Sequence, residues 1–222
     1  MIVAARNESD RIGATLDAIA AAFAGAHVFV ADDASGDGTS EIAIGRGATV
    51  VSRRRPHGKG GNVTAAAEAA LSDPEAAAED PVVLLCDADL GESAGSLRPL
   101  VDAVGRGEAD LAIASFARRE GGGFGIAVGY AQRKIRELSG FQASAPISGQ
   151  RAMLASTLRE LIPFADGWGM ETAMTIDAVR AGKRVVEVEL PLVHRATGRT
   201  LGGFLHRFAQ LRDFRKAVAA RR

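Results

Sequence analysis

Short apolar segments alternate with stretches of helical periodicity through the first half of the chain. The apolar segments have the length of β-strands and cover residues 1–4, 27–31, 48–52, 82–86 and 110–115. Between them, apolar side chains recur every three or four residues and predict helices over 9–23, 39–46, 60–71 and 93–105. This alternation predicts an α/β fold in which a mainly parallel central sheet lies between two layers of helices.

Beyond residue 115 the alternation ends. A glycine-rich stretch at 120–125 precedes a predicted helix at 127–139, and an irregular stretch follows. We then expect a helix near 168–181, a strand near 184–188 and a basic, amphipathic C-terminal helix. The apolar side of that last helix is formed by Phe204, Phe208, Leu211 and Phe214. Such a stripe packs in a core, forms a dimer contact or lies on an anionic membrane.

The strand at 82–86 leads directly to two carboxylates, Asp87 and Asp89. Its five uninterrupted apolar residues are typical of a strand covered on both faces, and ligands of open α/β sheets bind beyond the carboxyl ends of such strands. Two carboxylates there favour Mg²⁺ or Mn²⁺, because these ions take oxygen ligands and share them with substrate phosphates. The alternative is a polar strand end that only caps the next helix.

Asp32 and Asp33 follow the second predicted strand in the same way, and a tight turn then leads to Thr39. Consecutive strands of one sheet would point these carboxylates at the same edge as Asp87. Either aspartate could accept a hydrogen bond from a base or a ribose, and the helix start suits a phosphate. The alternative is a turn that only caps the helix.

A glycine-rich segment with one lysine, 58–61, follows the third predicted strand. Its glycines let the backbone approach a ligand, and Lys59 offers a positive charge to a phosphate. The segment is not a P-loop, because Arg53 stands where that motif needs its first glycine and Gly60 where it needs Ser or Thr.

Composition narrows the choice of partners and compartment. Basic and acidic residues number 27 each, so nothing global indicates a nucleic-acid partner. The one cysteine, Cys86, cannot form a disulfide framework and favours a reducing compartment. No apolar run has the length of a membrane span, and the amino terminus lacks the pattern of a secretory signal. We therefore expect a cytoplasmic protein.

Taken together, four segments resemble the family 2 glycosyltransferases, which have the GT-A nucleotide-diphospho-sugar transferase fold. Residues 3–8 resemble the family's first-strand signature, and 32–39 its acidic turn. Gly-Lys-Gly at 58–60 and Asp-X-Asp at 87–89 match two further motifs, and 148–152 is similar to a segment of polyprenyl-phosphate sugar transferases. The resemblance implies a single GT-A domain over 1–222, with 1–115 binding the nucleotide sugar and 116–222 the acceptor.

The resemblance also implies which residues bind the nucleoside of the donor. Ala5, Arg6 and Glu8 would line the nucleoside pocket, and Asp33 or its neighbour Asp32 would contact the base.

At the diphosphate, the resemblance implies roles for a second group of residues. Lys59 would bind the base or the diphosphate, Asp87 would lie near the ribose and the metal, and Asp89 would be the direct ligand of Mg²⁺ or Mn²⁺. His194 is a candidate third ligand, with a surface histidine as the alternative. Metal and basic groups would neutralise the leaving nucleoside diphosphate.

On the acceptor side, Glu171 falls where the family places a substrate-facing acid, with Asp166 just before it. An inverting enzyme uses a carboxylate there to take a proton from an acceptor hydroxyl. Many inverting relatives carry a Glu-Asp pair, whereas Thr172 follows Glu171 here. An acceptor that is already a phosphate anion needs no base, and the alternative role for Glu171 is to face the helix dipole.

The sequence thus predicts a metal-dependent glycosyltransferase that moves a sugar from a UDP- or GDP-sugar to a lipid-phosphate, saccharide or small-molecule acceptor. The alternatives are a nucleotide-sugar-binding protein without transfer activity and a sugar-phosphate nucleotidyltransferase. A homodimer and a peripheral contact of the C-terminal helix with the inner face of the membrane are further expectations.

Overall fold

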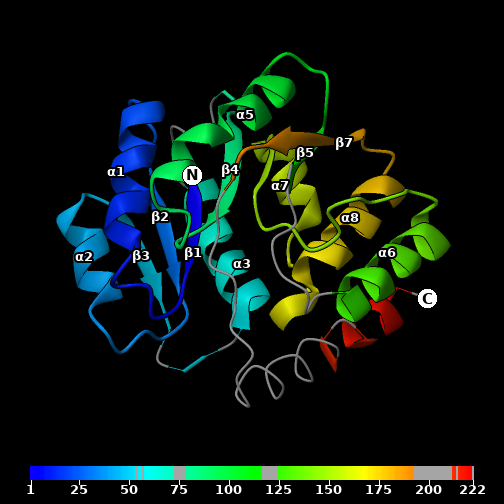
Figure 1. The fold of residues 1–222 in the computed structure, drawn as a ribbon, viewed down its shortest axis with the longest axis horizontal. Helices are drawn as coiled ribbons and strands as arrows, with labels where there is room; N and C mark the ends of the chain where they lie inside the picture. Colours follow the sequence, from blue (N-terminus) through cyan, green and yellow to red (C-terminus); the bar gives the residue numbers. More distant parts are fainter. Residues whose placement is uncertain are drawn as a thin grey trace.

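The computed structural model describes residues 1–53, 55–56, 58–72, 79–116, 125–192, 212–213 and 215–221. Its centre is a sheet of seven strands in the order β3-β2-β1-β4-β6-β5-β7 (Figure 1). The strands are β1 Ile2–Ala5, β2 Phe29–Asp32, β3 Thr49–Ser52, β4 Val82–Asp87, β5 Leu111–Phe116, β6 Arg151–Leu154 and β7 Val185–Leu190. All pairings are parallel except those of β6, which is antiparallel to β4 and β5. The prediction of a mainly parallel sheet is therefore confirmed.

Helices cover both faces of this sheet, as expected. One face packs against α1 Ile12–Ala22, α2 Thr39–Gly45, the 3₁₀ helix η1 Gly91–Leu97 and α5 Arg98–Gly105. The other packs against α3 Gly58–Leu71, α7 Ala155–Leu161 and α8 Met170–Arg180. Outside this second layer, α6 Gly125–Ser139 packs on α8 through Ile135 and Ile176. Among the described residues, no helix has the length and apolar character that crossing a bilayer requires.

The uninterrupted apolar run of β4 reflects burial on both faces of the sheet. Leu84 and Cys86 belong to the core under α1 and α5, whereas Val83 and Leu85 belong to the core under α3 and α7. Cys86 is buried, and this burial raises the pKa of its thiol to about 12. Cys86 is therefore an unreactive core residue.

One strand and one helix were not expected from the sequence. Strand β6 and helix α7 lie in the stretch that was predicted to be irregular. β6 begins with Arg151, whose side chain is completely buried, and such a residue interrupts the apolar pattern of a central strand. Its guanidinium donates to the carbonyl of Ser148 (2.8 Å) and to the hydroxyl of Thr175 on α8 (3.0 Å). These hydrogen bonds compensate for the burial of a polar side chain where a central strand usually carries an apolar one.

The amino-terminal end of α3 lies directly on the backbone of the loop that precedes α8. A Cβ atom added at Gly60 would stand 1.8 Å from the carbonyl oxygen of Ala165, and one at Gly58 would stand 2.9 Å from the Cα of Gly167. The next turn of α3 strengthens this contact, because the Thr64 hydroxyl accepts a hydrogen bond from the backbone N–H of Phe164 (3.0 Å). Only glycine permits this approach.

We expect Gly60→Ala to destabilise the protein by about 3 kcal/mol, because a rigid backbone carbonyl occupies the place of the new methyl group. The control is Gly129→Ala in α6, where no atom lies within 4 Å of the added Cβ. There the higher helix propensity of alanine should stabilise by about 0.5–1 kcal/mol. Urea denaturation measures both changes; equal stabilities for the two variants would contradict the close packing at Gly60.

Candidate active site

Two loops at the carboxyl edge of the sheet are fastened to each other. Residue 5 of β1 pairs with residue 32 of β2, so the loops that follow both strands start side by side. Asn7 donates from its backbone to the Ser35 hydroxyl (2.8 Å) and accepts with its side chain from the Gly36 N–H (3.0 Å). Glu8 donates from its backbone to the Thr39 hydroxyl (2.9 Å). The first-strand signature and the acidic turn thus form one rigid unit.

The two neighbouring aspartates of this unit have different surroundings. Both carboxylate oxygens of Asp32 accept hydrogen bonds from within the turn, one from Ser35 and the other from the Ser40 hydroxyl. Asp33 instead pairs with Arg6, whose guanidinium lies 3.5 Å away and is more than half exposed. Asp32 therefore shapes the turn, whereas the buried carboxylate of Asp33 pairs with Arg6, whose exposed side chain a nucleoside could reach.

A buried lysine joins two carboxylates from distant parts of the chain. The Lys59 ammonium, at the start of α3, lies 2.5 Å from Oδ1 of Asp87 at the end of β4. The same ammonium lies 2.8 Å from Oε1 of Glu171 at the start of α8. The Lys59 and Glu171 side chains are 16% and 4% exposed, so both charges are largely removed from water. The predicted donor and acceptor residues Asp87 and Glu171 are therefore brought together by Lys59.

The two carboxylates raise the pKa of Lys59. Burial by itself lowers that pKa, but the charges of Asp87 and Glu171 and their hydrogen bonds outweigh burial, and the pKa is raised above 10.5. A raised folded-state pKa means that the stabilisation by Lys59 is complete at neutral pH. It is lost only as the pH rises through the folded-state value in the alkaline range.

The segment before β6 completes the surroundings of Asp87. The Gln150 amide donates to Oδ2 of Asp87 (2.8 Å), and a Cβ added at Gly149 would stand 2.5 Å from Nζ of Lys59 and 2.6 Å from Oδ2 of Asp87. Sequence reasoning did not name Gly149 or Gln150 as site residues. The signal was present in the similarity of residues 148–152 to sugar transferases.

The backbone that carries Asp89 is fixed from α1. Arg11 donates to the carbonyl oxygen of Asp89 (3.2 Å), and the Thr15 hydroxyl bonds both the carbonyl of Ala88 and the N–H of Gly91. The side chain of Asp89 is half-buried, and Asp89 follows Asp87 by two residues. The carboxylates of Asp87, at the end of β4, and of Asp89, on the fixed turn that follows, fit Mg²⁺ or Mn²⁺, which typically take one or two protein carboxylates and complete their shell with phosphates and water.

Within the part of the chain that the structure describes, no group of three or more His, Cys, Asp or Glu side chains is assembled as for a metal held by protein alone. His194, the predicted third ligand, lies outside the described residues, as do Phe204, Phe208, Leu211 and Phe214 of the C-terminal stripe.

The remaining predicted residues lie outside the Lys59 cluster. Ala5 is buried and Glu8 half-buried in the first loop, beside Arg6. Asp166 is exposed and stands in extended backbone just before η2 Gly167–Gly169, the short 3₁₀ helix that leads into α8. Asp166 is therefore not part of the Lys59 cluster, whereas Glu171 is.

Comparison with known proteins identifies the family. The model of glycosyl transferase family 2 matches residues 1–162. The chain belongs to this family. Undecaprenyl-phosphate mannosyltransferase from Micrococcus luteus is 32% identical over 213 residues, which cover 89% of this chain and 84% of the relative. The predicted glycosyltransferase is thus confirmed, in preference to a nucleotidyltransferase or a binding protein.

Solved structures agree with this assignment. Glucosyl-3-phosphoglycerate synthase from Mycobacterium tuberculosis, in complex with Mn²⁺, UDP-glucose and phosphoglyceric acid, has a TM-score of 0.77 at 25% identity. The match covers 99% of this chain and 78% of that one. The same enzyme with Mg²⁺ and UDP gives a TM-score of 0.76 at 26% identity, over 99% and 77% of the two chains. The family 2 chain described here therefore has the GT-A fold.

We expect Lys59→Met to lower the free energy of unfolding at pH 7 by about 3 kcal/mol, because it leaves the buried carboxylate of Glu171 and the half-buried carboxylate of Asp87 without their shared cation. The control is Lys183→Met, which removes a pair with the exposed Glu160 (2.7 Å) and should cost at most about 1 kcal/mol. Chemical denaturation measures both. A loss at Lys59 no larger than that at Lys183 would show that the cluster is not a stabilising unit.

Proposed function

We propose that this glycosyltransferase moves a hexose from a UDP- or GDP-sugar to an acceptor that carries a phosphate group, with Mg²⁺ or Mn²⁺ bound at Asp89 and Asp87. The observation that carries the proposal is the Lys59 cluster, which joins the loop of the metal-binding motif to Glu171. The first half of the chain, 1–115, would bind the donor, and 116–222 the acceptor.

At the donor, separate groups of charged side chains would bind the nucleoside and the diphosphate. Asp33 and Arg6 would contact the nucleoside, and Asp89 with Asp87 would hold the metal against the diphosphate. The metal supplies Lewis-acid stabilisation of charge that grows on the leaving group. Lys59 adds a positive charge beside Asp87 at the same place, where low exposure makes electrostatic stabilisation effective.

In the transfer step, the bond between the sugar's anomeric carbon and the β-phosphate oxygen breaks, and a bond from the acceptor oxygen to that carbon forms. The nucleoside diphosphate leaves with the electron pair. A phosphate oxygen that is already ionised carries no proton to remove. Where the phosphate itself supplies the attacking oxygen, Glu171 need not act as a base, which agrees with its engagement by Lys59 at 2.8 Å.

The comparisons support a phosphate-bearing acceptor through the names of the relatives. One relative is named as an undecaprenyl-phosphate mannosyltransferase. The solved neighbour is a glucosyl-3-phosphoglycerate synthase that was crystallised with UDP-glucose and phosphoglyceric acid. The two acceptors that these names contain differ in size and polarity but share a phosphate, which is the only nucleophile of undecaprenyl phosphate, whereas phosphoglycerate also carries a hydroxyl. The homodimer, the cytoplasmic location and the membrane contact of the C-terminal helix stay predictions.

Donor binding is tested by thermal shift with UDP, GDP and their sugars, with and without Mn²⁺. A ligand at a hundredfold its dissociation constant adds about 2.7 kcal/mol, or roughly 5–10 °C at about 2–4 °C per kcal/mol. Asp89→Asn should remove the Mn²⁺-dependent part of the shift. Asp17→Asn, at an exposed side chain on α1, should retain it. No shift with any of these ligands would refute the donor site.

The role of Glu171 is tested with Glu171→Gln, which keeps an oxygen acceptor for Lys59. If the attacking oxygen belongs to a phosphate, kcat should fall less than tenfold and its pH dependence should not change, because loss of a general base costs about 10²–10⁴-fold. Products from a polyprenyl phosphate, from phosphoglycerate and from unphosphorylated sugars are compared by mass spectrometry. Transfer only to an unphosphorylated hydroxyl, with a loss above a hundredfold in Glu171→Gln, would overturn the proposed acceptor class.

A further inference from the structure

The loop at 165–169 lies between two other backbones. On one side it meets the start of α3, where glycine is required at Gly58 and Gly60. On the other side it meets the described part of the C-terminal segment, 212–213 and 215–221. A Cβ added at Gly167 would stand 2.2 Å from the Asp213 carboxylate, and one at Gly169 would stand 2.5 Å from the Cβ of Ala217. The loop is therefore held by close contacts on both sides.

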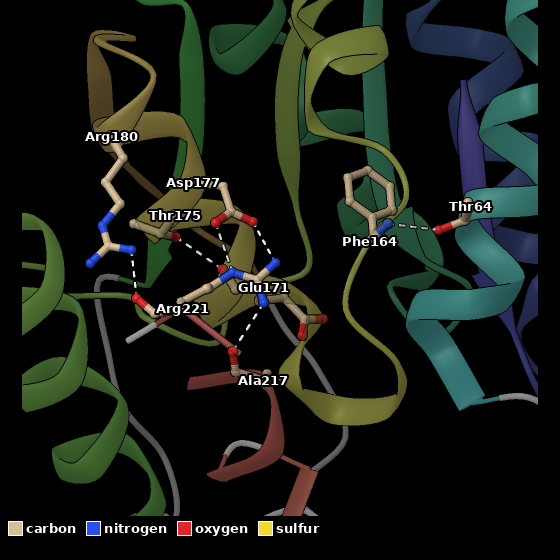
Figure 2. A network of polar contacts seen from close by, with 8 residues as sticks. All are labelled: Thr64, Phe164, Glu171, Thr175, Asp177, Arg180, Ala217 and Arg221. Carbon is tan, nitrogen blue, oxygen red and sulfur yellow. Dashed lines mark hydrogen bonds and ion pairs between the residues drawn. The ribbon is translucent and has the colours of Figure 1, made fainter. Parts of the chain in front are cut away.

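The C-terminal segment is itself fastened to α8 by a paired interaction. Both Nε and Nη2 of Arg221 donate to the two carboxylate oxygens of Asp177, at 2.7 and 2.5 Å. Arg221 also donates to the carbonyl of Ala217 (3.0 Å), and its own carbonyl accepts from Arg180 (2.6 Å). Figure 2 shows Arg221 between Asp177 and Ala217; Glu171 belongs to the same helix as Asp177, α8. Such a two-pronged contact fixes orientation as well as distance.

The close contacts among the start of α3, the loop at 165–169 and the C-terminal segment connect the Arg221–Asp177 ion pair to Lys59 and Glu171. Lys59 stands between Gly58 and Gly60, and Glu171 stands two residues after Gly169. Glu171 is also held by its carbonyl oxygen, which accepts from the Thr175 hydroxyl (3.0 Å). A displacement of the C-terminal segment from Gly167 and Gly169 would therefore shift the backbone that positions Glu171 relative to Lys59.

We propose that Arg221 is a positioning residue of the active site, which acts through Asp177 and the loop at 165–169 to hold Glu171 against Lys59. The kinetic part of this inference rests on the proposed function, whereas the structural part does not. Asp177 is the partner of Arg221 in this role. Neither residue touches the Lys59 cluster directly.

The test compares Arg221→Gln with Arg184→Gln. Arg184 makes an equally two-pronged contact with Asp110 (2.9 and 3.1 Å), but next to the amino ends of β5 and β7, at the opposite edge of the sheet. Hydrogen exchange is measured in both variants and needs no substrate. Amides of 165–171 and of the first turn of α3 should exchange at least tenfold faster in Arg221→Gln, and within twofold of the natural protein in Arg184→Gln.

The kinetic readout separates positioning from general stability. In Arg221→Gln, kcat should fall about tenfold while the dissociation constant of UDP with Mn²⁺ stays within twofold. Arg221→Lys should recover part of the loss, because lysine keeps the charge but not the fork. Asp177→Asn should reproduce the loss in kcat, and it replaces Arg221→Gln in the test if that variant does not fold.

The outcomes are distinct. Exchange and kcat within twofold of the natural protein in both Arg221→Gln and Asp177→Asn would overturn the inference. An equal effect of Arg184→Gln would also overturn it. If the natural protein transfers no sugar at all, the proposed function fails, and the exchange comparison alone decides the positioning role.

Discussion

The site depends on one buried cation between two carboxylates. Asp87 at the end of β4 and Glu171 at the start of α8 are far apart in sequence, and the Glu171 carboxylate could not be buried near that of Asp87 without Lys59. The position of Lys59 depends in turn on the approach of α3 to the loop before α8. That approach requires glycine at 58 and 60. The two ion pairs of Lys59 thus join the sheet edge, the start of α3 and the start of α8 into one structure.

The order of the strands explains why these groups meet. β1, β2 and β4 run parallel, so the loops after them share one edge. β6 runs the opposite way beside β4 and therefore begins at that edge, which brings Gly149 and Gln150 against Asp87. Helix α8 also begins at that edge and presents Glu171 in its first turn. The reversal at β6 is what lets the second half of the chain contribute to the site.

Much of this arrangement follows from the sequence. The apolar run before Asp87, the helical spacing from Ile12 to Phe23 and the alternation of the two patterns were enough to predict a parallel, doubly covered sheet. They also placed Asp33 and Asp87 at one edge, because parallel strands end together. The motifs then pointed to the family.

Other features could not be read from local patterns. β6 was missed because Arg151 begins it, and a buried arginine is satisfied by partners such as Thr175 that lie far away in sequence. The different roles of Asp32 and Asp33 depend on which one Ser40 reaches. The Lys59–Glu171 contact and the fastening of Arg221 to Asp177 depend on tertiary packing alone. Motif spacing identifies which residues gather at an edge, but not which of them touch.

The central claim is that the Lys59 cluster stands beside a metal-bound nucleoside diphosphate. The most direct measurement is a crystal structure with Mn²⁺ and UDP, in which anomalous scattering locates the metal. We predict a manganese peak about 2.1 Å from a carboxylate oxygen of Asp89, with the diphosphate between the metal and Lys59. A metal or a diphosphate bound away from Asp89 and Lys59, with the cluster untouched, would contradict this description of the site.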